Sequence, residues 1–226
     1  MKRVFPILLA VSSLALGQSV NDTTKRLDAA EAVVREVMDT PDKAIPQNLL
    51  DKAECVVVVP GLKKGAFVIG AKYGRGFVTC RSKGGQGWSA PGAVRVEGGS
   101  FGFQIGGSEI DVVMLVMNQR GAERLLSSKF TVGADAMAAA GPVGRTAQAE
   151  TDATMRAEIL TWSRSRGLFA GISLQGATLR QDGDGNQELY GKEGNNKDIV
   201  LGGQAVPPAA NKLISLLNKY SSRQTK

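Results

Sequence analysis

The chain contains no histidine, and this absence excludes the widest range of chemistry. Histidine is the most frequent general base in enzymes and the most frequent protein ligand of transition metals. The two cysteines alone are too few to make a zinc site. The sequence therefore predicts a protein with no catalytic residues, no metal site and no cofactor, which is to say a protein that is not an enzyme.

Aromatic residues are also scarce, at 5% of the chain, whereas 28 of the 226 residues are glycine. This composition is typical of tight turns and closely packed strands. The net charge of +7 favours anionic partners such as phospholipid headgroups. Nucleic acid is not expected as a partner, because the basic residues are not interleaved with aromatic side chains on which bases could stack.

The first 17 residues have the pattern of a secretory signal peptide. Lys2 and Arg3 precede an apolar run over Val4–Leu16, and Ala15-Leu16-Gly17 supplies the small residues that signal peptidase reads. The run is too short to cross a bilayer comfortably. We expect a signal peptide over residues 1–17, cleaved on export, and a periplasmic or secreted protein.

Cys55 and Cys80 are the only cysteines. An oxidising compartment would allow them to form a disulfide. Both lie in apolar, strand-like segments, so two buried free thiols are an equal alternative. The sequence does not give the Cα separation on which a disulfide depends.

Apolar periodicity predicts one α+β domain over residues 22–201 and a C-terminal tail over 202–226. An amphipathic helix is expected over Asp22–Met38, short helices over Pro46–Ala53 and Asn118–Ser127, and a last amphipathic helix over Ala210–Tyr220 in the tail. The segments between them favour a curved, mainly antiparallel, glycine-rich β-sheet or a partly closed barrel. Short strands are expected over Cys55–Val59, Ala66–Tyr73, Phe77–Arg81, Trp88–Ile105 and Ile110–Met117.

Glycine-containing segments are expected to form the turns between these strands, at Pro60-Gly61, Gly74-Arg75-Gly76 and Gly106-Gly107-Ser108. Several basic residues fall in or beside the expected turns. Turns at one rim of a sheet can converge into a surface that accepts phosphate groups. Lys63, Lys64, Lys72 and Arg75 are therefore the candidate residues for binding phosphate groups, and the alternative is that they are solvated turn residues that keep the protein soluble.

A polar segment over residues 181–186 is expected to be the turn of a terminal hairpin between Gly167–Leu179 and Glu188–Tyr190. Asp182, Asp184, Asn186 and Glu193 also occupy positions 1, 3, 5 and 12 of a calcium-loop pattern. Gln187 replaces the glycine that this pattern requires at position 6. We favour a structural turn and leave calcium binding over 182–193 as the alternative.

Longer motifs give a more specific signal. Four segments follow one another between about Ala53 and Gly191. In order they are CVVVVPGLKKGAFVIGAKYGRGFVTCR, GWSAPGAVRVEGGSFGFQIGGSEIDVVMLVMN, AAAGPVGR and WSRSRGLFAGISLQG. Together they closely resemble the SYLF domain, the Ysc-type domain of yeast actin- and lipid-binding proteins.

The resemblance implies a domain that binds phosphoinositides, and some yeast relatives also bind and bundle actin. Bacterial relatives are exported single domains thought to bind lipid. Actin is not expected as a partner of an exported bacterial protein, so only lipid binding is carried over from the resemblance. We therefore expect an exported protein that recognises anionic, phosphoinositide-like headgroups at a membrane surface. The alternative is a structural or protein-interaction module of the cell envelope without lipid specificity.

Overall fold

The computed structural model describes residues 22–40, 45–67, 69–82, 84, 86–101, 106–143, 156–165 and 168–222. The expected signal peptide lies outside these residues. The helices are α1 (Asp22–Asp39), α2 (Gln47–Lys52), α3 (Gln119–Leu125), α5 (Gly183–Tyr190), α6 (Asn196–Leu201), the 3₁₀ helix η1 (Pro208–Ala210) and α7 (Asn211–Tyr220). The strands are β1 (Cys55–Phe67), β2 (Ile69–Cys80), β3 (Gly92–Phe101), β4 (Gly106–Val116), β5 (Lys129–Thr131), β6 (Ala138–Ala140), β7 (Ile159–Ser165), β8 (Leu168–Gly171) and β9 (Thr178–Gln181).

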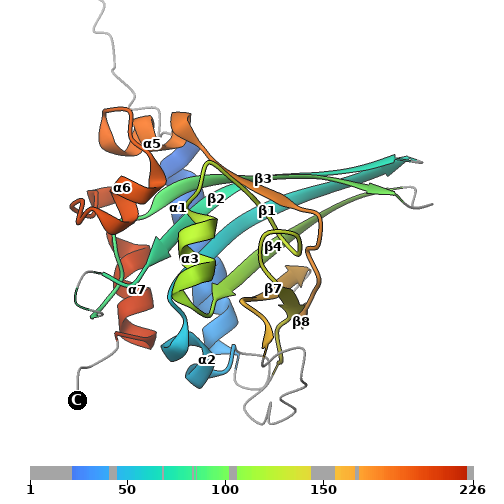
Figure 1. Cartoon of the computed structure of the whole chain (residues 1–226), viewed down its shortest axis with the longest axis horizontal. Helices are drawn as coiled ribbons and strands as arrows, with labels where there is room; N and C mark the ends of the chain where they lie inside the picture. Colours follow the sequence, from blue (N-terminus) through green and yellow to red (C-terminus); the bar gives the residue numbers. More distant parts are fainter. Residues whose placement is uncertain are drawn as a thin grey trace, which may run out of the picture.

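The nine strands form one sheet with the order β5-β9-β3-β2-β1-β4-β7-β6, and β8 also pairs with β7. Every strand pair is antiparallel except β6 with β7. The sheet curls into a half-barrel, with helices at one end and along its faces (Figure 1). The expected α+β fold, with its curved and mainly antiparallel sheet, is confirmed.

One face of the sheet is covered by α1 and α7. The apolar residues of α1 recur every three or four positions, so they line one side of the helix, and Leu27, Ala30 and Val34 are almost fully buried. Leu213 and Leu217 of α7 bury themselves in the same cluster. The two helices pack against each other as well as on the sheet (Figure 1). The expected helices at both ends of the described chain are therefore present, and they share one core.

The other face of the sheet carries a second core. Alternate residues of β1 supply the two cores: Val57 and Val59 face one, and Val56 and Val58 face the other. A strand that is buried on both faces needs an unbroken apolar run, and the sequence CVVVV provides it.

Arg81 ties the end of β2 to the ends of two helices. Its buried guanidinium donates hydrogen bonds to the carbonyl oxygens of Leu50 (2.9 Å), in the last turn of α2, of Ala53 (3.0 Å), directly after α2, and of Ser221 (2.7 Å), directly after α7. It also lies 3.8 Å from the ring centroid of Trp88. Carbonyl groups at helix C-termini carry partial negative charge, so they stabilise a buried cation. Arg81 therefore has a structural role.

The turns expected at Pro60-Gly61 and Gly74-Arg75-Gly76 are wrong. β1 continues through the first as a bulge, with Gly61 at φ 61°. β2 continues through the second, where a Cβ on Gly76 would lie 2.1 Å from the carbonyl oxygen of Val58. Gly76 is needed because the two backbones lie so close together. A glycine required for close packing cannot be told from a turn glycine in the sequence, so the prediction of a turn was wrong. The turn expected at 106–108 is likewise part of β4, and β3 begins only at Gly92.

The prediction of a terminal hairpin is also wrong. The polar segment after β9 begins a helix, α5, because the Asp182 side chain accepts a hydrogen bond from the backbone N–H of Gly185. An aspartate at this position stabilises the first turn of a helix. Gly191 ends α5 in the left-handed conformation.

Candidate functional site

The central strands extend well beyond the rest of the molecule and form what we call the arm (Figure 1). The arm consists of Lys63–Phe67 of β1, Ile69–Tyr73 of β2, Glu97–Phe101 of β3 and Gly106–Glu109 of β4. β9 pairs with β3 only as far as Glu97, and β7 pairs with β4 only from Asp111. Apart from Glu97, which pairs with Thr178 of β9, the described residues of the arm therefore form a four-stranded sheet without further strand partners.

Three of the four candidate lipid-binding residues lie in the arm, although in strands and not in turns. Lys64 and Lys72 are direct register partners on β1 and β2. Partners in an antiparallel pair have their side chains on the same face, about 5 Å apart at Cβ. The other members of this row across the sheet are Ser108 on β4 and Gly98 on β3. Neither of them carries a charge.

The Lys64–Lys72 pair is electrostatically unfavourable. Burial lowers the pKa of the Lys64 ammonium, and the positive charge of Lys72 lowers this pKa further. Among the residues that the structure describes, neither lysine forms an ion pair with a carboxylate. The pair is thus a place where an added anion would remove a repulsion that the fold tolerates.

Lys63 lies one residue away and therefore on the opposite face of the arm. Its register partners are Tyr73, whose side chain is 50% exposed, and Glu109. Glu97, in the same row, is already neutralised by Arg95 at 2.9 Å and Arg180 at 3.3 Å. In this row of the described strands, Glu109 is therefore the one carboxylate without a salt bridge to an arginine or lysine. One carboxylate does not balance three lysines, so the arm carries an excess of positive charge.

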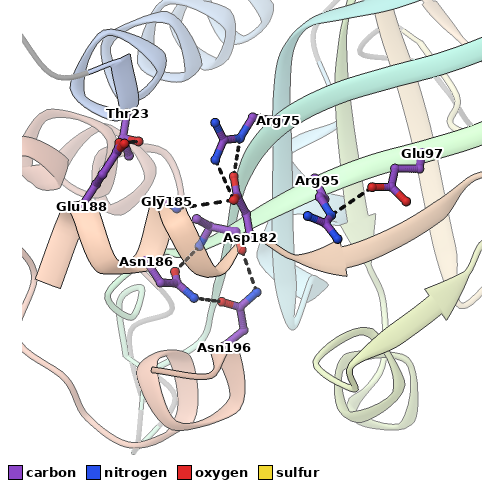
Figure 2. Close-up of polar contacts among 10 residues, drawn as sticks. Thr23, Arg75, Arg95, Glu97, Asp182, Gly185, Asn186, Glu188 and Asn196 are labelled. Atoms are coloured by element: carbon purple, nitrogen blue, oxygen red, sulfur yellow. Dashed lines mark hydrogen bonds and ion pairs between the residues drawn. The ribbon is translucent and has the colours of Figure 1, made fainter. Parts of the chain in front are cut away.

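The fourth candidate, Arg75, lies in a different cluster (Figure 2). Its guanidinium donates two hydrogen bonds to the carboxylate of Asp182, at 2.5 and 2.7 Å. Arg75 also shares this region with Arg26 of α1. The sequence placed Arg75 in a turn beside Lys72, whereas the strand places it three residues along, on the opposite face, with its cation bound to a carboxylate.

The same cluster joins α5 and α6 to the sheet. The Asn186 side chain accepts a hydrogen bond from the backbone N–H of Ala93 (2.7 Å) and donates one to Asn196 (2.8 Å), which in turn donates to the carbonyl of Ala93 (2.9 Å) (Figure 2). All three residues are almost fully buried. These buried polar groups therefore form hydrogen bonds with one another, and the cluster connects α5 and α6 to β3.

Burial raises the pKa of the Asp182 carboxyl, but the hydrogen bonds and charge of Arg75 outweigh this effect and set that pKa below its usual range. The hydrogen bond to Asp182 correspondingly raises the pKa of Arg75. Asp182 is thus held as a carboxylate by Arg75 and by the start of α5. In the calcium-loop pattern it would be the first ligand, and no group of three or more metal-ligating side chains is found among the described residues.

Cys55 and Cys80 are joined by a disulfide, which is one of the two alternatives that the sequence left open. They are register partners at the ends of β1 and β2 that lie away from the arm. Both are buried, at 0% and 3% exposure. The disulfide therefore fixes the register of the two strands on which the arm is built.

The structure thus has a basic four-stranded arm on a curled, glycine-rich sheet, and the similarity to known proteins is specific. Residues 97–220 match the family described as "Ysc84: Las17-binding protein actin regulator". The chain belongs to this family, the Ysc84 or SYLF family, as its motifs predicted. The match extends through α7, within the segment expected to be a tail.

Similar proteins are found in animals and fungi. The chain is 34% identical over 184 residues to the SH3 domain-containing YSC84-like protein 1 of Rattus norvegicus, covering 81% of this chain and 54% of the rat protein. It is 32% identical over 189 residues to Protein YSC84 of Saccharomyces cerevisiae, covering 82% of this chain and 40% of the yeast protein. The chain thus spans about half the length, or less, of these relatives. Within its described residues, no helix is long and apolar enough to cross a membrane.

Proposed function

We propose that the protein binds anionic phospholipid headgroups at a membrane surface, and that Lys63, Lys64 and Lys72 of the arm carry this binding. The observation that supports the proposal most strongly is the Lys64–Lys72 pair, which has two cations in register and, within the described part of the chain, no carboxylate in an ion pair with either. Phosphate oxygens are strong acceptors for ammonium groups. A headgroup between the two lysines would replace their repulsion with two attractions.

The position of the lysines suits a membrane surface better than a small soluble anion. Lys64 and Lys72 lie on one face of the arm and Lys63 on the other, at nearly the same level along the strands. A planar layer of phosphates that meets the arm end-on can contact both faces at once. Each lysine near an anionic surface contributes about 1 kcal/mol to binding.

The same proposal includes export and the absence of catalysis. The Cys55–Cys80 disulfide supports the expected periplasmic or secreted location, because disulfides persist in oxidising compartments. The description of the family is that of a binding protein, which supports a protein that is not an enzyme.

Flotation with lipid vesicles tests the proposal. Wild-type protein is expected to float with vesicles that contain phosphatidylserine or a phosphoinositide, and not with phosphatidylcholine alone. Replacement of Lys63, Lys64 and Lys72 by glutamine is expected to weaken binding roughly 100-fold, from about 1 kcal/mol for each charge. The matched control replaces Lys129, Lys192 and Lys197, which are exposed and outside the arm, with the same loss of net charge. Equal losses in both triple variants would show a nonspecific charge effect and would reject the arm as the site.

The second candidate is a protein-interaction module, which the description "Las17-binding protein actin regulator" favours for the family. In this chain the exposed apolar side chains Met137 and Leu168, at 55% and 66% exposure, lie in or next to the edge strands β6 and β8. An exposed edge strand can pair with a strand of another protein. This candidate would be favoured if binding to a partner protein were lost when Met137 and Leu168 are replaced and kept when the arm lysines are replaced. Actin remains unexpected as a partner of an exported protein.

A further inference from the structure

The arm ends in a zone without charge, and this feature goes beyond headgroup recognition. The last charged residues are Lys64 on β1, Lys72 on β2, Glu97 on β3 and Glu109 on β4. The register places all four in two neighbouring rows of the sheet. The sequence contains no Asp, Glu, Lys or Arg between Lys64 and Lys72, or between Glu97 and Glu109. On all four strands, the last charged residue therefore lies at nearly the same position along the arm.

Beyond this level the described rows contain only glycine, alanine, serine, phenylalanine and isoleucine. The next row joins Gly107, Gly65, Ala71 and Gly99 across the four strands. At the end of the described strands, Phe67 of β1 is the register partner of Ile69 of β2, and Ile69 is the register partner of Phe101 of β3. Two phenylalanines and one isoleucine are thus neighbours in the register at the far end of the arm.

We propose that the uncharged end of the arm enters the bilayer, while the lysines remain among the headgroups. Phe67 lies three residues beyond Lys64, which corresponds to about 10 Å of extended strand. Apolar faces of membrane-surface proteins reach about 5–10 Å into the boundary between headgroups and acyl chains. The length of the uncharged zone therefore matches the depth at which phenylalanine and isoleucine would leave water. This inference rests on the proposed function, because the lysines bring the arm to the surface.

Backbone hydrogen bonding limits the depth of insertion. Within the arm β1 pairs with both β2 and β4, and β2 pairs with β3, so the inner strands have their backbone groups satisfied. The outer edges of β3 beyond Glu97 and of β4 before Asp111 have no strand partner among the described residues. Unpaired backbone groups are costly in the hydrocarbon core. The arm therefore enters the upper part of one leaflet and does not cross the membrane.

Tryptophan fluorescence measures the depth directly. The native Trp88 and Trp162 are buried, at 4% and 0% exposure, so the wild-type spectrum supplies the background. In Phe67→Trp and Phe101→Trp, anionic vesicles are expected to shift the emission to the blue, and lipids brominated on their acyl chains are expected to quench it. Tyr73→Trp, in the row of Lys63 and outside the uncharged zone, is the matched control and is expected to show little quenching.

Flotation of the same variants separates the two proposals. Binding to anionic vesicles without quenching of Phe67→Trp or Phe101→Trp overturns insertion and leaves headgroup recognition standing. No binding of the wild-type protein to anionic vesicles overturns both. A blue shift that is already present without lipid, together with a doubled mass in sedimentation, would show that a second copy covers the arm and would also overturn insertion.

A change of affinity gives an independent test. Replacing Phe67 and Phe101 by serine is expected to weaken partition into anionic vesicles roughly 10-fold for each phenylalanine removed from the membrane. Met137→Ser together with Leu168→Ser, which removes exposed apolar side chains elsewhere, is expected to leave partition unchanged. An unchanged affinity of the phenylalanine variant, with its urea unfolding midpoint equal to that of the wild type, contradicts insertion.

Discussion

Lys64 and Lys72 lie opposite each other in neighbouring strands, and none of the residues that the structure describes gives either lysine a carboxylate partner. Stability alone would favour an opposite-charge pair at these positions, because like charges directly opposite in a sheet are destabilising. The pair is therefore the clearest place in the described structure where stability and the proposed headgroup binding make opposite demands on the same residues.

Replacing Lys72 by glutamine is expected to stabilise the fold by about 0.2–1 kcal/mol, because it removes this repulsion. The same change is expected to raise the pKa of Lys64 towards its ordinary value and to weaken binding to anionic vesicles. Urea unfolding, lysine side-chain NMR titration and flotation measure the three effects. Lys192→Gln is the control and is expected to change none of them. A Lys72→Gln variant that is less stable and binds equally well would contradict this interpretation.

Asp182→Asn is expected to destabilise the protein by about 1–3 kcal/mol at neutral pH, because Arg75 loses its charged partner and α5 loses its capping carboxylate. The pKa of Asp182 is lower in the folded protein than in the unfolded chain. Its contribution to stability is therefore complete above the unfolded pKa, about 3.9, and is lost as the pH falls through the folded value.

Urea unfolding of both proteins at several pH values checks this expectation. The difference between wild type and Asp182→Asn should shrink as the medium becomes more acidic. Asp184→Asn, an exposed change in the same helix, should cost far less. A difference that is constant with pH would show that the carboxylate charge of Asp182 is unimportant.

Arg81→Lys is expected to destabilise the protein by roughly 2 kcal/mol although the charge is kept. The planar guanidinium bonds to carbonyl groups at the C-terminal ends of α2 and α7 at the same time, and a lysine ammonium cannot reproduce this geometry. Arg120→Lys, on an exposed part of α3, is the control. If thermal unfolding shows the two substitutions to be equally mild, Arg81 does not have the structural role assigned to it.

Replacing both Cys55 and Cys80 by serine is expected to lower stability by about 2–4 kcal/mol, because the disulfide closes a loop of 25 residues and restricts the unfolded chain. A reducing agent should lower the urea midpoint of the wild type to a similar extent and leave the variant unchanged. Equal midpoints for wild type and variant under oxidising conditions would show that the disulfide does not stabilise the fold.

The sequence predicted the fold class, the family and the helices that carry a clear apolar face, because these depend on periodicity and on ordered motifs. It did not predict the arm, because the glycines around Pro60 and Arg75 have the composition of turns. Only the packing of β2 against Val58 shows that Gly76 is required within a strand. The ion pair of Arg75 with Asp182 joins residues 107 positions apart, so no local pattern could reveal it.

The sequence identified the lysines of the predicted lipid site by their charge, but it did not predict how they are arranged in the sheet. Lys63 and Lys64 are neighbours in sequence but lie on opposite faces of a strand, whereas Lys64 and Lys72 are brought together by the register of β1 with β2. A register is set by the whole sheet, including the bulge after Val59.

Lysine side-chain NMR with a short-chain, monomeric phosphatidylserine tests the central claim most directly. We predict that the lipid shifts the ammonium signals of Lys64 and Lys72 and raises the pKa of Lys64, because a phosphate between them offsets their repulsion. The signals of Lys192 and Lys197 should not move. Shifts confined to lysines outside the arm, with the pKa of Lys64 unchanged at saturating lipid, would contradict the assignment of the arm as the headgroup-binding site.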